Sequence, residues 1–119
     1  MKVYISGPMS GIPGYNYEAF AEAALQLRLA GYENVVSPHE IWCDESAGYA
    51  QDSTAADWHR HMRADIAALL ECDTIVLLPG WQMSKGARLE LTIALELGFA
   101  VFFREGGGEK WRLVPMGRE

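Results

Sequence analysis

The chain is poor in cysteine: among its 119 residues only Cys43 and Cys72 carry a thiol. The two are far apart and fit no metal-binding spacing. His59 and His61 lie two residues apart in a helical pattern and therefore point in different directions. We expect reduced cysteines, as in a cytoplasmic protein, and neither a metal ion nor another cofactor.

The chain also lacks an excess of positive charge and any long hydrophobic run. Its formal net charge is -6, whereas binding a nucleic acid polymer requires clustered Lys and Arg. No apolar run approaches the length of a membrane span, and the N-terminus begins with a strand pattern instead of a secretion signal. We therefore expect a cytoplasmic protein that binds a small molecule, with room for one locally bound anion.

Strand and helix patterns alternate along the chain, which is long enough for one domain, residues 1–119, with one core. This alternation predicts a single-domain α/β fold of the flavodoxin or Rossmann type, a parallel sheet of four to five strands with flanking helices. Asn16 is expected to cap the first helix. The predicted strands cover residues 3–5, 34–37, 73–78 and 100–103, and the predicted helices 16–31, 55–71 and 84–98. Residues 111–114 form either a fifth strand or a packed tail.

The first loop, Ser6 to Gly14, is rich in Gly, Pro and Ser and directly follows the first strand. In an open parallel sheet this is the edge where ligands bind. Gly7 and Gly11 let the backbone approach a ligand closely, and Ser6 and Ser10 offer hydroxyls. A plain turn is the alternative, and without a GxGxxG pattern a dinucleotide is not inferred.

Two carboxylates lie on helix faces where apolar residues are expected. The neighbours of Glu90 one turn away are all small or apolar, and Asp65 lies three residues after Met62 and four before Leu69. The helix of Asp65 has its predicted apolar stripe at Trp58, Met62, Ile66, Leu69 and Leu70. Because burying an unpaired charge is costly, each carboxylate is either a packing defect or a working group.

The start of the last long helix offers a site for an anion. Ser84 is the predicted cap of a helix that ends at Gly98, and free N–H groups at a helix start favour a phosphate or carboxylate. Because this helix start and the first loop lie at the same edge of the sheet, they can border one crevice with the two carboxylates. Two carboxylates flanking a substrate suit cleavage of a glycosidic bond, which is one option among several.

The stretch from residue 39 to 54 has no regular pattern, which is typical of a binding loop, a lid or a mobile segment. Within it, Trp42 and Tyr49 could stack on a flat ligand or could fix the loop to the body of the protein.

Several separated motifs, in the right order over roughly residues 1–103, resemble those of the nucleoside 2-deoxyribosyltransferase superfamily. The chain is most similar to its small bacterial and phage members, near the deoxynucleoside 5′-monophosphate N-glycosidases. The motifs are Tyr4-Ile-Ser-Gly-Pro-Met-Ser-Gly11, Arg63-Ala-Asp65, Cys72-Asp73, Leu78-Pro-Gly-Trp81 and the stretch from Ser84 to Gly98.

The resemblance implies that Glu90 attacks the anomeric carbon of the sugar and forms a covalent glycosyl-enzyme, resolved by a second base or by water. It implies that Asp65 contacts the base and manages its proton, and that Tyr4 lies near the nucleophile. A Ser at the position of Ser84 contacts the 5′-phosphate in the nucleotide hydrolases, where transferases acting on free nucleosides carry an Asp. The substrate-binding positions implied are Ser6, Gly7, Ser10, Gly11, Ser84 and Gly86.

We therefore expect an enzyme that cleaves or exchanges the N-glycosidic bond of a nucleoside 5′-monophosphate, with a 2′-deoxy sugar favoured. A non-catalytic nucleotide-binding or sensing module is the alternative, and a structural subunit with a vestigial pocket is a third possibility. The resemblance also implies a homodimer or a higher homo-oligomer.

Overall fold

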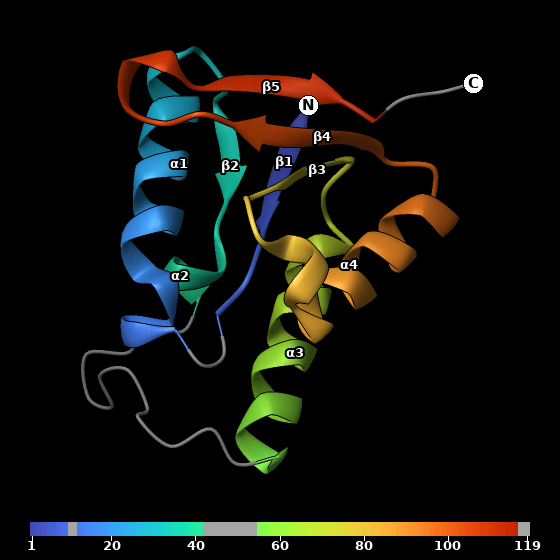
Figure 1. Cartoon of the computed structure of the whole chain (residues 1–119). Coiled ribbons are helices and arrows are strands. Elements are labelled where there is room, and N and C mark those ends of the chain that lie inside the picture. Colours follow the sequence, from blue (N-terminus) through green and yellow to red (C-terminus); the bar gives the residue numbers. More distant parts are fainter. Residues whose placement is uncertain (10–11, 42–54, 117–119) are drawn as a thin grey trace.

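The computed structural model describes residues 1–9, 12–41 and 55–116 of the chain (Figure 1). Ser10, Gly11, Trp42, Cys43 and Tyr49 lie outside the described residues. The strands are β1 (Lys2–Ser6), β2 (Asn34–Val36), β3 (Thr74–Leu77), β4 (Ala100–Glu105) and β5 (Arg112–Pro115). The helices are α1 (Tyr17–Leu29), α2 (Pro38–Ile41), α3 (Ala55–Leu69) and α4 (Lys85–Glu96), with short 3₁₀ turns at Pro13–Asn16, Trp81–Met83 and Gly108–Lys110.

The strands form one five-stranded sheet in the order β2-β1-β3-β4-β5. The first four strands pair in parallel, and β5 pairs antiparallel to β4. The predicted α/β fold is confirmed, and residues 112–115 form an edge strand. After β1 the chain runs outward to β2 and then returns to the other side of β1 for β3. The strand order therefore reverses between β1 and β3, the place where parallel α/β sheets usually bind ligands.

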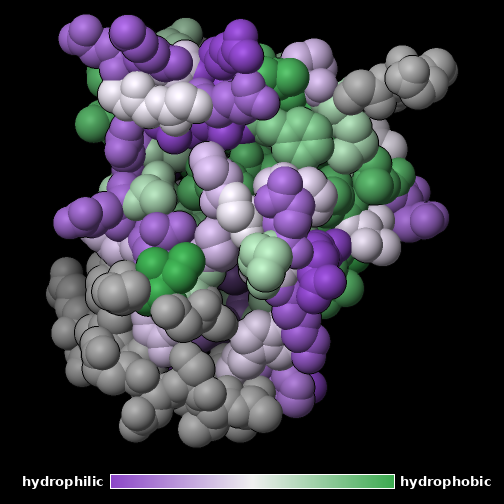
Figure 2. Space-filling model, viewed as in Figure 1, coloured by the Kyte–Doolittle hydropathy of each residue, from purple (hydrophilic) through white to green (hydrophobic). Residues whose placement is uncertain are grey.

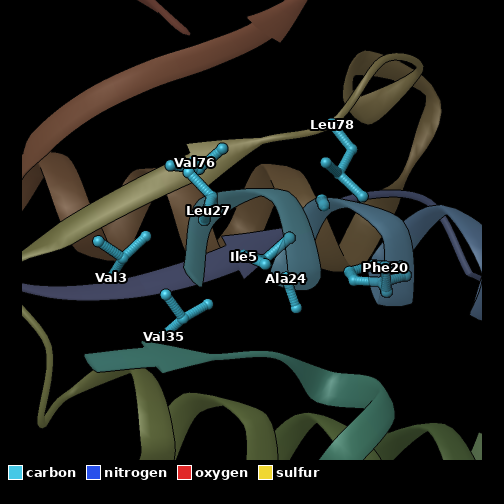
Figure 3. Packing of buried hydrophobic residues seen from close by; sticks show 9 residues of the cluster. Val3, Ile5, Phe20, Ala24, Leu27, Val35, Val76 and Leu78 are labelled. Atoms are coloured by element: carbon cyan, nitrogen blue, oxygen red, sulfur yellow. The ribbon is translucent and has the colours of Figure 1, made fainter. Parts of the chain in front are cut away.

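Helices cover both faces of the sheet (Figure 1). The core on one face joins β1, β2 and β3 to α1, and Figure 3 shows its side chains meeting between strands and helix. That core contains Val3, Ile5, Phe20, Ala23, Ala24, Leu27, Val35, Val76 and Leu78. The core on the other face joins the sheet to α3 and α4 and contains Tyr4, Leu69, Cys72, Ile75, Leu77, Leu91, Ala94 and Val101. Alternate residues of β1 thus serve opposite faces.

Helix α4 begins and ends as its sequence predicts. The Ser84 hydroxyl accepts a hydrogen bond from the N–H of Ala87 at 3.1 Å, which satisfies one of the free donors of the first turn. Beyond the last turn, Gly98 has a φ of 77°, a left-handed conformation that favours glycine. These two signals fix the position of the helix along the chain.

The start of α1 differs from the prediction, because Asn16 does not cap the helix with its side chain. Gly14, Tyr15 and Asn16 all have positive φ, and the Asn16 amide donates to the carbonyl of Pro8 at 3.0 Å. The Tyr15 ring meets His61 of α3 edge-on, with ring centroids 6.5 Å apart. Through this left-handed turn, Asn16 contacts Pro8 at the start of the same loop, and Tyr15 contacts α3.

A polar cluster fastens the loop between β4 and β5 to α1. The Arg104 side chain is buried between Glu22, Gln26 and the ring of Trp111, and its guanidinium donates to the side-chain oxygens of both α1 residues. Glu22 also accepts from the N–H of Gly108 at 3.2 Å, and the Gln26 amide donates to the Gly108 carbonyl at 2.8 Å. The C-terminal hairpin is thereby held against the helix.

Gly106 is required by the backbone of this loop. Its φ is 77°, and a Cβ at this position would lie 2.5 Å from the carbonyl oxygen of Lys110. We expect Gly106→Ala to lower the free energy of unfolding by about 2 kcal/mol, measured by urea denaturation. Gly107→Ala is the matched control, since a Cβ there meets nothing within 4 Å, and it should change stability by less than about 0.5 kcal/mol. Equal losses in the two variants would contradict the explanation.

The surface of the described part is mixed in character (Figure 2). None of the helices in residues 1–9, 12–41 and 55–116 is long and apolar enough to cross a bilayer. Hydrophobic side chains exposed near the end of α4 include Leu95 and Leu97.

Candidate active site

The floor of the candidate site is the part of β1 that faces α3 and α4. Tyr4 and Ser6 are two residues apart and therefore point to the same side of the strand. Both side chains are fully buried. They lie on an interior strand at the reversal of strand order, toward the carboxyl end of β1. The fold thus brings two hydroxyls to the place where a ligand crevice is expected.

Glu90 reaches from α4 to this floor and is only 4% exposed. The Tyr4 hydroxyl donates to Glu90 Oε2 at 2.6 Å, and the Ser6 hydroxyl donates to Glu90 Oε1 at 2.6 Å. Each carboxyl oxygen therefore has one short hydrogen bond from β1. The unusual carboxylate on the apolar face of α4 is a buried, partnered group whose orientation is fixed by two donors.

Burial changes the acidity of this group. Loss of solvent raises the pKa of Glu90 from 4.5 to about 7, although the hydrogen bonds from Ser6 and Tyr4 act in the opposite direction. The pKa of Tyr4 is raised well above its usual value, first by burial and then by the negative charges of Glu90 and Asp65. Tyr4 therefore stays protonated and serves as a donor, while Glu90 changes charge near neutral pH.

Asp65 is the second carboxylate of the site. It lies on α3, is 3% exposed, and its charge acts on the Tyr4 hydroxyl together with that of Glu90. The structure therefore brings both predicted carboxylates, from two different helices, into the surroundings of one phenol. Helices α3 and α4 pack closely, since a Cβ on Gly86 would lie 3.0 Å from the sulfur of Met62. This close packing explains why the residue at position 86 is a glycine, which has no side chain.

Ser84 stands at the start of α4, six residues before Glu90. The residue is half-buried and its hydroxyl accepts from Ala87 N–H, while no acceptor among the described residues takes its own hydrogen, which can go to a ligand oxygen. The first-turn N–H groups of a helix and its dipole favour an anion at such a position. Nearby, the Lys85 ammonium lies 4.5 Å from the centre of the Trp58 ring of α3. The local charge at this end of α4 therefore suits a phosphate.

Two residues of the first loop have contacts that the sequence did not reveal. Ser6 is closed off from solvent and bonded to Glu90, and Gly7 lies against the end of β3, where a Cβ would be 2.9 Å from Leu78 Cβ. The same-face spacing of Tyr4 and Ser6 was the available signal for a shared partner. Which carboxylate they share depends on how α4 packs over β1.

A shallow groove of about 550 Å³ lies along α3. Neither Glu90 nor Asp65 lines it, but Trp58 and Met62 do, and these two residues meet Lys85 and Gly86 at the start of α4. The residues that line the groove are Trp58, His59, Met62, Arg63, Ile66, Ala67 and Leu70. Leu70 was predicted to belong to the buried stripe, but its side chain is 55% exposed, because α3 ends at Leu69 and Leu70 lies in the turn after it.

In the described part of the chain no group of three or more His, Cys, Asp or Glu side chains could hold a metal ion. Cys72 is a free thiol buried beside α3, and burial raises its pKa to about 11. A protonated thiol of this kind is a poor nucleophile and metal ligand.

Comparison with known proteins gives a family but no activity. A family model described as "Domain of unknown function (DUF4406)" matches residues 1–103, which include β1 to β3, α4 and every candidate site residue. No curated protein matches the chain.

Proposed function

Because the chain belongs to the DUF4406 family, whose description names no activity, we propose its function from the site itself. The protein is an enzyme that breaks the N-glycosidic bond of a nucleoside 5′-monophosphate, with a 2′-deoxy sugar preferred. The sugar is passed to water or to another base. The observation that supports this most directly is the buried Glu90 carboxyl, held by two hydroxyl donors at the carboxyl end of β1.

In the proposed reaction, the ionised Glu90 attacks the anomeric carbon while the bond from this carbon to the base nitrogen breaks. The base leaves with a proton supplied from the side of Asp65, and the sugar remains as an ester of Glu90. Water or a second base then attacks the same carbon and frees the carboxylate. A buried carboxyl with a pKa near neutrality can be ionised for attack and is also a good leaving group from the ester.

The test is incubation with a panel of deoxynucleoside and ribonucleoside 5′-monophosphates, with free base followed by chromatography. Release of base from at least one of them, lost on substitution of Glu90, supports the proposal. Binding without release over the whole panel would contradict it and would favour the nucleotide-sensing module. Adding a second free base to the reaction distinguishes exchange from hydrolysis, because exchange forms a new nucleotide.

We further propose that Ser84 receives the 5′-phosphate, which gives a second prediction. Ser84→Asp keeps a side-chain acceptor for the N–H of Ala87, so the helix cap is preserved. The added negative charge should repel a phosphate, so kcat/KM for the monophosphate should fall at least about a hundredfold. Activity on the matching nucleoside should fall much less. Equal loss on both substrates would place the phosphate elsewhere.

A further inference from the structure

We propose that Ser6 is a positioning residue, whose hydroxyl holds Glu90 Oε1 in the orientation for attack instead of contacting the substrate. The kinetic part of this inference rests on the proposed function, whereas its structural part does not. It departs from the role in sugar or phosphate binding that the resemblance implies for the position.

The Ser6 hydroxyl points at Glu90 and not at solvent. Its side chain is fully buried, and its hydroxyl is 2.6 Å from Glu90 Oε1. Tyr4 makes the equivalent bond to Oε2. Together the two bonds fix the plane of the carboxyl group, because each oxygen is restrained by a donor from the same rigid strand. Removing one donor leaves that oxygen buried without a partner.

The two donors differ in what they can do when Glu90 changes charge. The Ser6 hydroxyl rotates about its Cβ–Oγ bond, so it can donate to a carboxylate and can accept from a protonated carboxyl. Tyr4 is held as a donor first by its burial and then by the negative charges of Glu90 and Asp65, which together raise its pKa. Among the described residues, Tyr4 of β1 bonds directly to Glu90, and Asp65 of α3 and the Cys72 thiol act on Tyr4.

The hydrogen bond from Ser6 also favours the ionised form of Glu90. Ser6→Ala should therefore raise the pKa of Glu90 from about 7 by about one unit. The shift can be measured by ¹³C NMR of the side-chain carboxyl in the protein without substrate. An unchanged pKa in Ser6→Ala would overturn the proposal.

Ser37 provides the matched control. It is also fully buried, but its hydroxyl lies 2.5 Å from Nδ1 of His39 and contributes nothing to Glu90. Ser37→Ala removes the same atom from a buried serine just beyond a neighbouring strand. It should leave the Glu90 carboxyl titration as in the wild type. A shift as large as that of Ser6→Ala would mean that general loosening of the sheet edge, and not the hydrogen bond, is responsible.

The rate of base release tests the same role during turnover. With the pKa raised by one unit, Ser6→Ala should lose about fivefold in kcat at pH 7 through the smaller ionised fraction of Glu90, and it should recover this part at pH 9. The loss of orientation should lower kcat at both pH values, with KM unchanged. If Ser6 touched the substrate, KM would rise at every pH, which would overturn the proposal. Ser6→Thr, which restores the hydroxyl, should return the profile toward that of the wild type.

The two readouts separate this inference from the proposed function. A Glu90 pKa shift in Ser6→Ala without base release by any form of the protein would support the positioning role and contradict the enzyme. Base release with no pKa shift in Ser6→Ala would support the enzyme and contradict the positioning role. If Ser6→Ala does not fold, Ser6→Cys has nearly the same size and a much weaker donor, and the same two results apply to it.

Discussion

Glu90→Gln should reduce the rate of base release at least about a thousandfold, because an amide cannot form the glycosyl ester. The substitution preserves shape, and the hydroxyls of Tyr4 and Ser6 can still donate to the amide oxygen or accept from its nitrogen. Loss of activity therefore cannot be attributed to a collapsed site. The measurement is single-turnover formation of free base from the best substrate of the panel.

Glu96→Gln is the control for this loss. Glu96 lies on the same helix but is exposed, so its substitution removes the same charge without touching the site. It should retain the wild-type rate within about twofold. A second variant, Glu90→Asp, keeps a carboxylate but shortens it by one methylene group, so it cannot reach both hydroxyls. Full activity in Glu90→Gln would rule out a nucleophilic Glu90.

Glu90→Gln should also stabilise the protein above neutral pH. Ionising the buried Glu90 opposes folding, since its pKa in the folded chain is about 7 against an ordinary value of 4.5. That difference corresponds to about 3 kcal/mol, and the Glu90→Gln variant avoids this cost because its amide carries no charge. We expect Glu90→Gln to unfold at about 10 °C higher temperature than the wild type at pH 8.

The difference in stability between Glu90→Gln and the wild type should grow as the pH rises. Below about pH 4.5 Glu90 is protonated in both folded and unfolded chains, so its ionisation costs nothing and the two proteins should be similar. As the pH rises toward 7 the unfolded chain loses a proton that the folded chain keeps, and the wild type loses stability relative to the variant. Calorimetry at pH 5 and pH 8 measures this, with Glu96→Gln as the reference. A gap that narrows as pH rises would contradict the assignment.

The main elements of the fold could be predicted because their signals are local. β3 is buried along its whole length and reads as a continuous apolar run, and α4 has Ser84 at one end and Gly98 at the other. The single turn of α2 was missed because its four residues are too few to show a helical periodicity. Asn16 is the residue before α1, as predicted, but its side chain does not cap the helix, because its left-handed backbone depends on the contacts of the turn around it.

The site was predictable in part. A carboxylate among small and apolar neighbours marked Glu90 and Asp65, and the structure buries both beside Tyr4. The bond from Ser6 to Glu90 could not be predicted, because it joins residues 84 positions apart. Its existence depends on the depth at which α4 packs on the sheet, which is set by small contacts such as that between Gly86 and Met62.

The C-terminal hairpin determines how the sheet ends. The family match stops at residue 103, inside β4, whereas β5 pairs along β4 from Phe102 to Glu105. A chain shortened to the matched region would leave the backbone of β4 open along one side, and open strands join to those of other molecules. In the longer chain β5 is the outer strand, and it ends with Pro115, which has no N–H to donate to a strand of another molecule. β5 therefore covers a side of β4 that would otherwise be open to pairing with another molecule.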